Sequence, residues 1–323
     1  MKIVVTGGAG YVGWSLVDIL RRRPEVVEIA VLDNFRRANY AVLSLRRLQS
    51  TPKIQVFRDD VLNSRGLRTM LNGADVVCHL AAVARSPYSK ESPHEFDQIN
   101  HWGSAEICYA VEDLGIPRLV YMSSGAVYGQ GDAECTPDSP VNPISAYGDS
   151  KFAGERQVER LAKRTDVFIL RSGTVYGLNP CVRFDTALNR FCLHAVLNKP
   201  LLIHGDGQQR RAVIHIDTVA RLLAHAALGD LDPGLYHAVD ANPSIAEAVS
   251  LLRTITPIIE YNHVNQRQRL GSLILAQDAR LSHYQQAAPD IRQTLATMLV
   301  EMGFPLMSNS TGQTQDLNGA TDD

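Results

Sequence analysis

Residues 2–13 of the chain read KIVVTGGAGYVG, and this stretch decides the fold. The apolar run at residues 3–5 is typical of a buried parallel strand. Gly7, Gly10 and Gly13 follow at once, and apolar residues at helical spacing come after them. Glycines at such positions permit a tight turn, close approach of a pyrophosphate to the backbone, and close packing of a helix on a strand. The stretch therefore predicts a strand, a glycine turn and a helix whose free N–H groups face the phosphates of a dinucleotide.

The second apolar run, residues 26–32, is followed by Asp33, twenty residues past Gly13. A carboxylate at that distance is placed to accept hydrogen bonds from the adenosine ribose hydroxyls and to repel a 2′-phosphate. We therefore expect NAD as the cofactor. Arg36 and Arg37 follow Asp33 closely and could reach a 2′-phosphate, so NADP stays open as the alternative.

The bulk properties exclude several classes of protein. The chain has 323 residues, enough for one large domain or a domain with a lobe. Its 32 Lys and Arg nearly balance its 34 Asp and Glu, so we expect neither a nucleic-acid partner nor a membrane-surface partner. The glycine turn lies close to the first residue and no long apolar stretch follows, so a cytoplasmic protein without a signal peptide is expected. The five cysteines are scattered, which favours reduced thiols and no metal site.

Strand and helix patterns alternate through the first two thirds of the chain, as in parallel sheets with helical crossovers. The predicted fold class is α/β, with a Rossmann-type doubly wound parallel sheet over residues 1–172. A smaller substrate-binding lobe is expected over 173–305, with segments that return to the sheet, and a polar, disordered tail over 306–323. The expected strands are 2–6, 27–33, 54–58, 75–79, 117–122 and 167–171.

Two of these strand ends carry candidate cofactor contacts. Asp59 and Asp60 follow the third strand, where a contact with adenine and a solvated strand end are equally good interpretations. Ala81 and Ala82 follow the fourth strand, and small side chains there let a cofactor lie against the backbone. A helix is then expected over residues 96–114, with Phe96, Ile99 and Trp102 on one apolar stripe.

Two later stretches carry the chemistry. Residues 121–129 read YMSSGAVYG and follow an apolar strand, and residues 145–151 read SAYGDSK and open a helix. Tyr147 and Lys151 are four residues apart, so they share a helix face. A lysine ammonium and a positive nicotinamide ring are both expected to lower the pKa of the Tyr147 phenol from its ordinary value near 10. Ser124 could hydrogen-bond the same substrate oxygen, so Tyr147 is the predicted proton acceptor and Ser124 its partner.

Together these motifs resemble the extended short-chain dehydrogenase/reductases, in particular the NAD-dependent epimerase/dehydratase group that acts on nucleotide sugars. The similarity covers roughly residues 2–280. It rests on the motifs at 6–13, 80–82, Asn100, 123–129, 147–151 and 205–211.

The resemblance implies a role for each candidate site residue. The expected cofactor-binding residues are Gly7, Gly10, Tyr11, Val12 and Gly13 at the pyrophosphate, Asp33 and Asn34 at the ribose, Asp60 and Val61 at adenine, and Asn100 and Lys151 at the nicotinamide ribose, with Leu80, Ala81, Ala82, Ser123 and Tyr147 as further cofactor contacts. The expected catalytic residues are Ser124, Tyr147 and Lys151, and the expected substrate-binding residues are Ser124, Thr174, Arg211 and Arg269. Arginine forks at the last two positions suit the oxygens of a nucleotide diphosphate; a surface arginine is an equally good interpretation of Arg269.

The sequence departs from the family pattern in its substrate half. Gly125 and Ala126 stand where dehydratases of the family carry an Asp-Glu pair, so elimination of water lacks its acid and base. Thr174 replaces the usual asparagine, and Ala212 and Ser272 replace expected acids. The sequence therefore defines the cofactor better than the sugar.

The main hypothesis is an NAD-dependent nucleotide-sugar epimerase, most like a 4-epimerase. One alternative is a one-way NAD(P)-dependent ketoreductase that uses the same residues, and another is a non-catalytic cofactor-binding regulator, which would be expected to lack Tyr147 or Lys151. The helices at 95–114 and 147–165 are each expected to carry an outer apolar stripe. In this family that helix pair commonly builds a two-fold dimer, so a homodimer is expected.

Overall fold

A seven-stranded parallel sheet forms the centre of the computed structural model, which describes residues 1–45, 53–84, 92–264, 271–285 and 290–304. The strand order is β11-β7-β5-β4-β1-β2-β3, and every neighbouring pair runs parallel. The strands are β1 (Lys2–Thr6), β2 (Glu28–Asp33), β3 (Lys53–Arg58), β4 (Val76–His79), β5 (Arg118–Ser124), β7 (Asp166–Ser172) and β11 (Gly234–Ala238). The predicted Rossmann-type fold is confirmed, and the six expected strands lie within two residues of their predicted bounds. β11 was not expected, because glycine, tyrosine and histidine break its apolar run.

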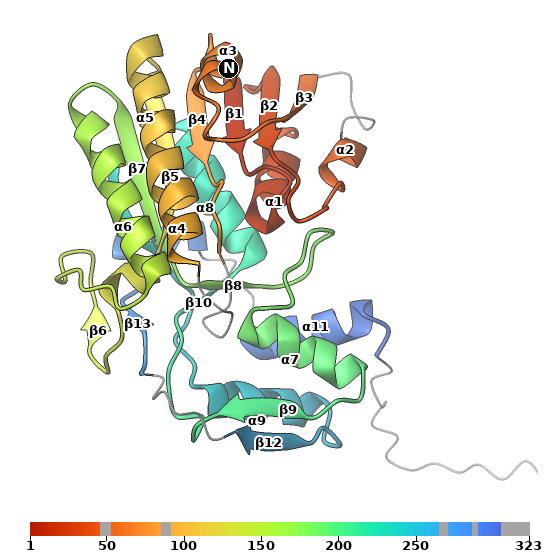
Figure 1. Ribbon diagram of the computed structural model, residues 1–323. Helices are drawn as coiled ribbons and strands as arrows, with labels where there is room; N and C mark the ends of the chain where they lie inside the picture. The colour runs from red at the N-terminus through yellow and green to blue at the C-terminus, as the bar shows by residue number, and fades with distance from the viewer. Residues whose placement is uncertain (46–52, 85–91, 265–270, 286–289, 305–323) are drawn as a thin grey trace, which may run out of the picture.

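Helices cover both faces of the sheet (Figure 1). Ile3 and Val5 pack into one apolar cluster and Val4 into the other, because consecutive strand residues point to opposite faces. The first face is covered by α1 (Tyr11–Leu20), α2 (Val42–Leu45), α8 (Ile216–Leu228), η4 (Ala279–Leu281) and α10 (Ser282–Gln285). The second is covered by α3 (Ser64–Leu71), α5 (Gly103–Leu114), α6 (Ala146–Glu159) and η3 (Arg160–Lys163).

The lobe has a hydrophobic core of its own. Its elements lie below the sheet in the view of Figure 1, and two of its strands form a small parallel sheet. They are α7 (Ala187–Val196), β9 (Leu201–His204), α9 (Ile245–Ile255), β12 (Tyr261–Val264) and α11 (Ile291–Glu301). The later half of the chain also supplies β11 and α8 to the main sheet, so the chain crosses between the two parts more than once.

Two short parallel strand pairs connect the sheet with the lobe. One joins β8 (Thr174–Tyr176) to β10 (Val213–His215), and the other joins β6 (Glu134–Cys135) to β13 (Ile274–Leu275). The turn η2 (Gly125–Tyr128) continues directly from β5 and packs with Leu275 and Ala212 in a fourth apolar cluster. These pairs therefore lie beside the end of β5 that carries Ser124.

The chain reverses its winding direction between β1 and β4, which are neighbours in the sheet. In open α/β sheets, ligands bind outside the carboxyl ends of the strands at such a switch point. The glycine turn, Asp33, Leu80 and Ser124 all follow or end strands at this edge.

The helix expected over residues 96–114 is interrupted. It begins as α4 (Pro93–Phe96), continues as a π-helical segment η1 (Asp97–Trp102), and only then becomes α5. The wider π turn changes the direction of the side chains, so Phe96 is 2% exposed and Trp102 is 54% exposed. The single stripe predicted for Phe96, Ile99 and Trp102 is therefore wrong.

Several sequence expectations concern segments or groups outside the sheet. The predicted tail at 306–323 lies outside the described residues. In the described ranges we find no helix with the length and apolar character needed to cross a bilayer, and no group of three His, Cys, Asp or Glu arranged to hold a metal ion. All five cysteines are free thiols.

Candidate active site

The glycine turn leaves no room for side chains. Gly7 has a φ of +70°, and a Cβ there would lie 2.7 Å from the amide nitrogen of Ala81. A Cβ on Gly13 would overlap the carbonyl oxygen of Gly7, and one on Gly10 would lie 3.0 Å from the same atom. No side chain of the described chain caps α1 at Gly10. The turn therefore offers a bare helix N-terminus in a backbone cradle, which fits a diphosphate group.

Asp33 fastens the end of β2 to the glycine turn. Its Oδ2 accepts a hydrogen bond from the Ala9 amide at 3.1 Å and its Oδ1 accepts one from the Phe35 amide at 2.8 Å. Burial raises the pKa of the Asp33 carboxyl, although both backbone hydrogen bonds and Arg37 act in the opposite direction. Each carboxylate oxygen keeps a second lone pair for a ribose hydroxyl.

Asn34 and Asp60 lie together at the next two strand ends. The Asn34 amide donates to Asp60 Oδ2 at 2.9 Å, and Asp60 Oδ1 accepts from the Leu62 amide at 3.0 Å. Val61 is 3% exposed and fills the space beside Gly103 on α5. Its side chain belongs to the core, so only its backbone remains available for the predicted contact with adenine.

The two arginines after Asp33 interact with other parts of the protein. Arg36 forms an ion pair with Glu95, and Arg37 Nη2 donates to the carbonyl oxygen of Ala84 at 2.8 Å. Both contacts draw the guanidinium groups toward the segment after β4. This arrangement favours the NAD interpretation of Asp33 over the NADP alternative.

Leu80, Ala81 and Ala82 leave the end of β4 half-buried, directly against Gly7. Asn100, in the π-helical segment, is 1% exposed. Its Oδ1 accepts from the Val83 amide at 2.8 Å, and its Nδ2 donates to the Val83 carbonyl and to Ser150 Oγ, both at 3.0 Å. Both amide hydrogens of Asn100 are used in these hydrogen bonds, so the side chain braces the β4 exit against α6 and has no donor left for the predicted contact with the nicotinamide ribose.

The first turn of α6 carries the predicted proton acceptor. Ser145 caps the helix by accepting from the Gly148 amide at 3.1 Å, and Tyr147 follows with its ring edge-on to Phe96 at 5.9 Å. Ser124, at the end of β5, accepts from the Ala126 amide at 3.2 Å, and its side chain lies close enough to Tyr147 to lower the pKa of the phenol. The structure thus brings Ser124 and Tyr147 together, as the sequence predicted.

The electrostatics of Tyr147 differ from the expectation. Burial raises the pKa of the Tyr147 phenol, and the lowering effects of the Ser124 hydrogen bond and the Arg183 charge do not reverse it. The sequence-based expectation of a lowered pKa is therefore wrong for the protein groups alone, because it counted the nearby lysine and omitted burial. A phenolate at neutral pH requires further positive charge at the site.

Lys151 lies one turn after Tyr147 and is 3% exposed. Its Nζ lies 4.2 Å from the centre of the Tyr121 ring, in a cation–π contact. Burial lowers the pKa of the Lys151 ammonium to about 7, and the Glu155 carboxylate acts in the opposite direction. The charge of Lys151 is thus sensitive to its protein surroundings.

The Ser123 side chain lies in the protein interior. It is 3% exposed, and its hydroxyl donates a short hydrogen bond to Oε1 of Glu155. The prediction that Ser123 contacts the cofactor is therefore wrong for its side chain, because the hydroxyl is hydrogen-bonded to Glu155. Glu155 also forms a buried ion pair with Arg171, at 2.7 Å between Oε2 and Nη2.

A loop of the later half is hydrogen-bonded to the glycine turn, which the sequence did not indicate. The Tyr11 hydroxyl donates to the Gly177 carbonyl at 2.5 Å and accepts from Asn189 at 3.3 Å. Asn179 Nδ2 donates to the Tyr11 carbonyl at 2.8 Å and to Ser15 Oγ at 2.9 Å. The Tyr11 side chain thus binds this loop, so only its backbone amide can serve the pyrophosphate.

Arg183 lies in the same loop and acts electrostatically on both Tyr147 and Tyr11. It pairs with Asp185 through two hydrogen bonds, of 3.0 and 2.6 Å. Its Nη2 also donates to the Ala84 carbonyl at 3.1 Å, the oxygen that Arg37 contacts. The loop therefore meets the cofactor end of the sheet from the lobe side.

The predicted substrate residues gather around β8 and β10. The Thr174 amide donates to the Ala212 carbonyl at 2.8 Å, beside Arg211, and the Thr174 side chain is exposed. Arg211 Nη1 donates to the Gly271 carbonyl at 2.7 Å, and its backbone bridges to Leu273. Arg269 lies outside the described residues.

Gly125 directly follows Ser124 and lies beside Leu273 and Leu275, near the predicted substrate residues. A Cβ on Gly125 would lie 2.9 Å from Leu275 Cδ1 and 3.4 Å from Leu273 Cδ2. The position is therefore closed by leucine side chains, and an acid there would have to displace them.

Comparison with known proteins agrees with this geometry. A family model described as "NAD dependent epimerase/dehydratase family" matches residues 3–235. A Bacillus subtilis protein named "Uncharacterized UDP-glucose epimerase YtcB" is 30% identical over 266 residues, which is 80% of this chain and 81% of that protein. A UDP-glucuronate 4-epimerase of Thermodesulfobacterium geofontis is 30% identical over 226 residues, 68% of this chain and 69% of that one.

Among solved structures, a UDP-glucuronic acid 4-epimerase from Bacillus cereus, in complex with UDP-glucuronic acid and NAD, superposes with a TM-score of 0.81. The sequence identity is 25%, and the match covers 94% of this chain and 99% of that one. The similarity therefore extends over both the sheet and the lobe.

Proposed function

The chain belongs to the NAD-dependent epimerase/dehydratase family, and from that premise we propose that it is an NAD-dependent epimerase of a nucleotide sugar, most like a 4-epimerase. One observation carries the proposal: Ser124 lies close enough to Tyr147 to lower the pKa of its phenol, and Lys151 lies one turn further along α6. This trio stands at the carboxyl ends of the strands, where the bare glycine turn also lies.

The glycine turn indicates which residues would bind each part of the cofactor. The backbone amides of the Gly7–Gly13 turn would hold the pyrophosphate, and Asp33 with Asn34 would hold the adenosine ribose. Asp60 would face adenine, with Leu80, Ala81 and Ala82 beside the nicotinamide half. When bound, NAD supplies a reversible acceptor for a hydride from the sugar carbon.

The residues of α6 and β5 would handle the proton. Tyr147 takes the proton of the reacting sugar hydroxyl and later returns it, and Ser124 hydrogen-bonds the same oxygen. Lys151, as an ammonium, would hold the nicotinamide ribose and favour the phenolate of Tyr147. The keto-sugar must then turn within the lobe so that its other face is reduced.

Dehydration is disfavoured by the environment of Ser124. Gly125 and Ala126 carry no acid or base, and Leu273 and Leu275 close the space beside Gly125. Elimination of water requires both an acid and a base near the sugar. The residues that follow Ser124 therefore favour epimerisation over dehydration, the other reaction in the family's description.

One-way reduction is disfavoured by the loop of residues 177–189. Its hydrogen bonds to Tyr11 and Ser15 hold the lobe against the first turn of α1. Release of a nucleotide from the glycine turn would require this loop to move. A ketoreductase exchanges its cofactor at every turnover, whereas an epimerase can keep it bound. A non-catalytic role is disfavoured because Tyr147 and Lys151 are both present on one helix.

The substrate side is proposed from fewer contacts. Arg211 would bind the diphosphate of the nucleotide sugar, with Thr174 near the sugar and Arg269 as a second cation. Arg211 and Thr174 lie on adjacent segments near Gly125, which supports a common site.

We also propose a homodimer. Trp102 and Tyr109, on the outer side of η1 and α5, are 54% and 46% exposed. Among the described residues of 147–165 no large apolar side chain is exposed, so the second expected stripe is absent and α5 would contribute most of the contact. Light scattering should give twice the mass of one chain, and Trp102→Asp should reduce it; a monomeric wild type at micromolar concentration would contradict the dimer.

The proposal is tested with a panel of UDP-, GDP- and dTDP-sugars. We expect one or more of them to be converted to an epimer, followed by NMR, without accumulation of reduced nicotinamide. Net consumption of reduced nicotinamide with each turnover would identify a ketoreductase instead, and loss of water from the sugar would identify a dehydratase.

A further inference from the structure

Lys151 is a buried cation with little water around it. It is 3% exposed and lies between α6, β4 and β5. A buried ammonium is costly unless an anion or a strong dipole stabilises it. Tyr121 contributes its ring face at 4.2 Å, but the phenol itself is neutral because burial raises its pKa well above 10. His79 on β4 is neutral too, because burial lowers its pKa to about 3.

Glu155 is the carboxylate that acts on Lys151. The two residues are one helical turn apart on α6, as Tyr147 and Lys151 are, so all three share a face. Glu155 is 0% exposed, which leaves its charge nearly unscreened by solvent. A carboxylate in this position raises the free energy needed to remove a proton from Lys151.

Hydrogen bonds from two elements fix the direction of the Glu155 carboxylate. Ser123 on β5 donates to Oε1. Arg171 on β7 donates from Nε to Oε1 at 3.1 Å and from Nη2 to Oε2 at 2.7 Å. The carboxylate is therefore fixed by Arg171 and Ser123, and Lys151 lies one helical turn away on the same face of α6.

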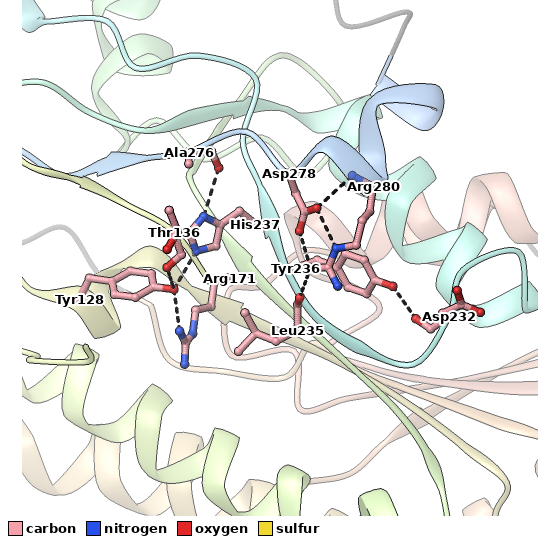
Figure 2. Close-up of polar contacts among 10 residues, drawn as sticks. All are labelled: Tyr128, Thr136, Arg171, Asp232, Leu235, Tyr236, His237, Ala276, Asp278 and Arg280. Atoms are coloured by element: carbon pink, nitrogen blue, oxygen red, sulfur yellow. Dashed lines mark hydrogen bonds and ion pairs between the residues drawn. The ribbon is translucent and has the colours of Figure 1, made fainter. Parts of the chain in front are cut away.

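Arg171 is in turn held by Tyr128 and His237 (Figure 2). Its Nη1 donates to the Tyr128 hydroxyl at 2.6 Å, and that hydroxyl lies 2.7 Å from His237 Nε2. His237 Nδ1 faces the Ala276 carbonyl at 3.1 Å, an acceptor, so Nδ1 carries the ring hydrogen. Burial lowers the pKa of His237, so the ring is neutral and Nε2 is an acceptor; the one hydroxyl hydrogen of Tyr128 is shared between Nε2 and the Thr136 carbonyl, which lies at 3.0 Å.

These contacts form one buried group, which we call the Glu155 network: Ser123, Tyr128, Glu155, Arg171 and His237. All five residues are less than a tenth exposed. It spans β5, η2, α6, β7 and β11, and His237 reaches the segment after β13. Ser123 directly precedes Ser124 in the chain, and Glu155 lies one turn from Lys151. The network therefore supports both Ser124 and Lys151.

We propose that Glu155 is a positioning residue that keeps Lys151 protonated, with the Glu155 network fixing its carboxylate one helical turn from the lysine. This role of Glu155 rests on the proposed function, which gives the Lys151 ammonium its purpose at the nicotinamide ribose and beside Tyr147. Without the ammonium, the nicotinamide ribose loses a charged donor and the Tyr147 phenolate loses a neighbouring positive charge.

The test measures NAD affinity against pH, which needs no substrate. Isothermal titration of the purified chain between about pH 6 and pH 10 covers the ionisation of a shifted lysine. We expect the affinity of the wild type to fall as pH rises past about 7, where Lys151 loses its proton. Lys151→Met should bind NAD more weakly and lose this fall.

Glu155→Gln should move the start of the fall to a pH lower by about one unit, because the stabilising carboxylate is gone. The matched control is Glu159→Gln, the same substitution one turn further on α6 at an exposed position. It should behave as wild type. A merely structural role for Glu155 would weaken NAD binding equally at every pH. An unmoved starting pH in Glu155→Gln would overturn the proposal, as would a Lys151→Met variant that keeps the wild-type pH dependence.

Glu155→Gln leaves the Arg171 guanidinium buried without a carboxylate, which can prevent folding. The double variant Glu155→Gln/Arg171→Met removes both charges, an exchange that buried ion pairs often tolerate. In this variant too, the pH at which NAD affinity begins to fall should be lower than in the wild type. An unchanged value would again overturn the proposal. If the wild type epimerises no sugar while these pH shifts occur, the proposed function fails and the role of Glu155 stands.

Discussion

Two of the helix N-termini at the carboxyl edge of the sheet, those of α1 and α6, are built in opposite ways. The first turn of α1 follows glycines and is not capped by a side chain within the described structure. The first turn of α6 is capped by Ser145, and Tyr147, Lys151 and Glu155 follow on one face. The first offers backbone amides to a ligand, and the second offers side chains.

This difference determines what each site tolerates. A backbone cradle fails when an atom is added, because Gly7 and Gly13 have no space for a Cβ. A side-chain site fails when an atom is removed or a charge is changed, because its function resides in a hydroxyl and two charges. Substitutions should therefore separate cofactor binding, located at α1, from proton transfer, located at α6.

The largest effect is expected at α6. Tyr147→Phe keeps the ring and its packing on Phe96 but removes the proton acceptor. Turnover should fall by a factor on the order of one hundred to ten thousand, the usual size of a general-base contribution. NAD affinity should barely change. Tyr261→Phe, at an exposed tyrosine of the lobe, is the matched control and should keep full turnover.

The next largest effect is expected at α1. Gly13→Ala adds a Cβ that overlaps the Gly7 carbonyl, so the turn must open. NAD affinity should fall on the order of a hundredfold, about 2.7 kcal/mol. Gly10→Ala, where the nearest atom would be 3.0 Å away, should lose less. Gly131→Ala meets open space among the described residues and should bind NAD as wild type. Equal affinities across the three variants would contradict a backbone cradle.

A smaller effect is expected on cofactor choice. Asp33→Asn removes the charge that should repel a 2′-phosphate, so the preference for NAD over NADP should decrease by roughly tenfold, or about 1.4 kcal/mol. The variant should not come to prefer NADP strongly, because Arg36 and Arg37 are drawn toward Glu95 and Ala84. Titration with both nucleotides measures the ratio. A wild type that prefers NADP would show that Asp33 is misassigned.

The smallest effect concerns the loop that covers the turn. Tyr11→Phe removes the hydrogen bonds to Gly177 and Asn189 while keeping the ring. NAD should dissociate roughly three to ten times faster, which corresponds to about one hydrogen bond. Stopped-flow displacement measures the rate, and turnover at saturating NAD should remain near wild type. An unchanged dissociation rate would show that the loop does not retain the cofactor.

The two helix N-termini also differ in how far the sequence could predict them. The glycine turn and the position of Asp33 depend on local spacing, which a sequence displays directly. The Tyr147 and Lys151 pair was equally local, since four residues make one helical turn. These features were sufficient for the fold class and for the position of the site.

The surroundings of Lys151 depend on residues far apart in the chain. Glu155 could have been found, because it continues the four-residue spacing from Lys151. Arg171 and His237 could not, because no sequence spacing relates β7 and β11 to α6. Burial was also hidden, which is why the pKa of Tyr147 is raised where the sequence alone suggested a lowered value. The hydrogen bonds of the Tyr11 side chain were hidden for the same reason, because its partners come from residues 177–189.

We propose that one site removes a hydride from a sugar carbon and returns it to the same carbon. The most direct test uses a nucleotide sugar that the wild type accepts, deuterated at the reacting carbon, with unlabelled NAD. We predict that the epimer forms with its deuterium retained and that no reduced nicotinamide is released. Transfer of the deuterium to released nicotinamide, with an oxidised sugar as the product, would contradict the claim.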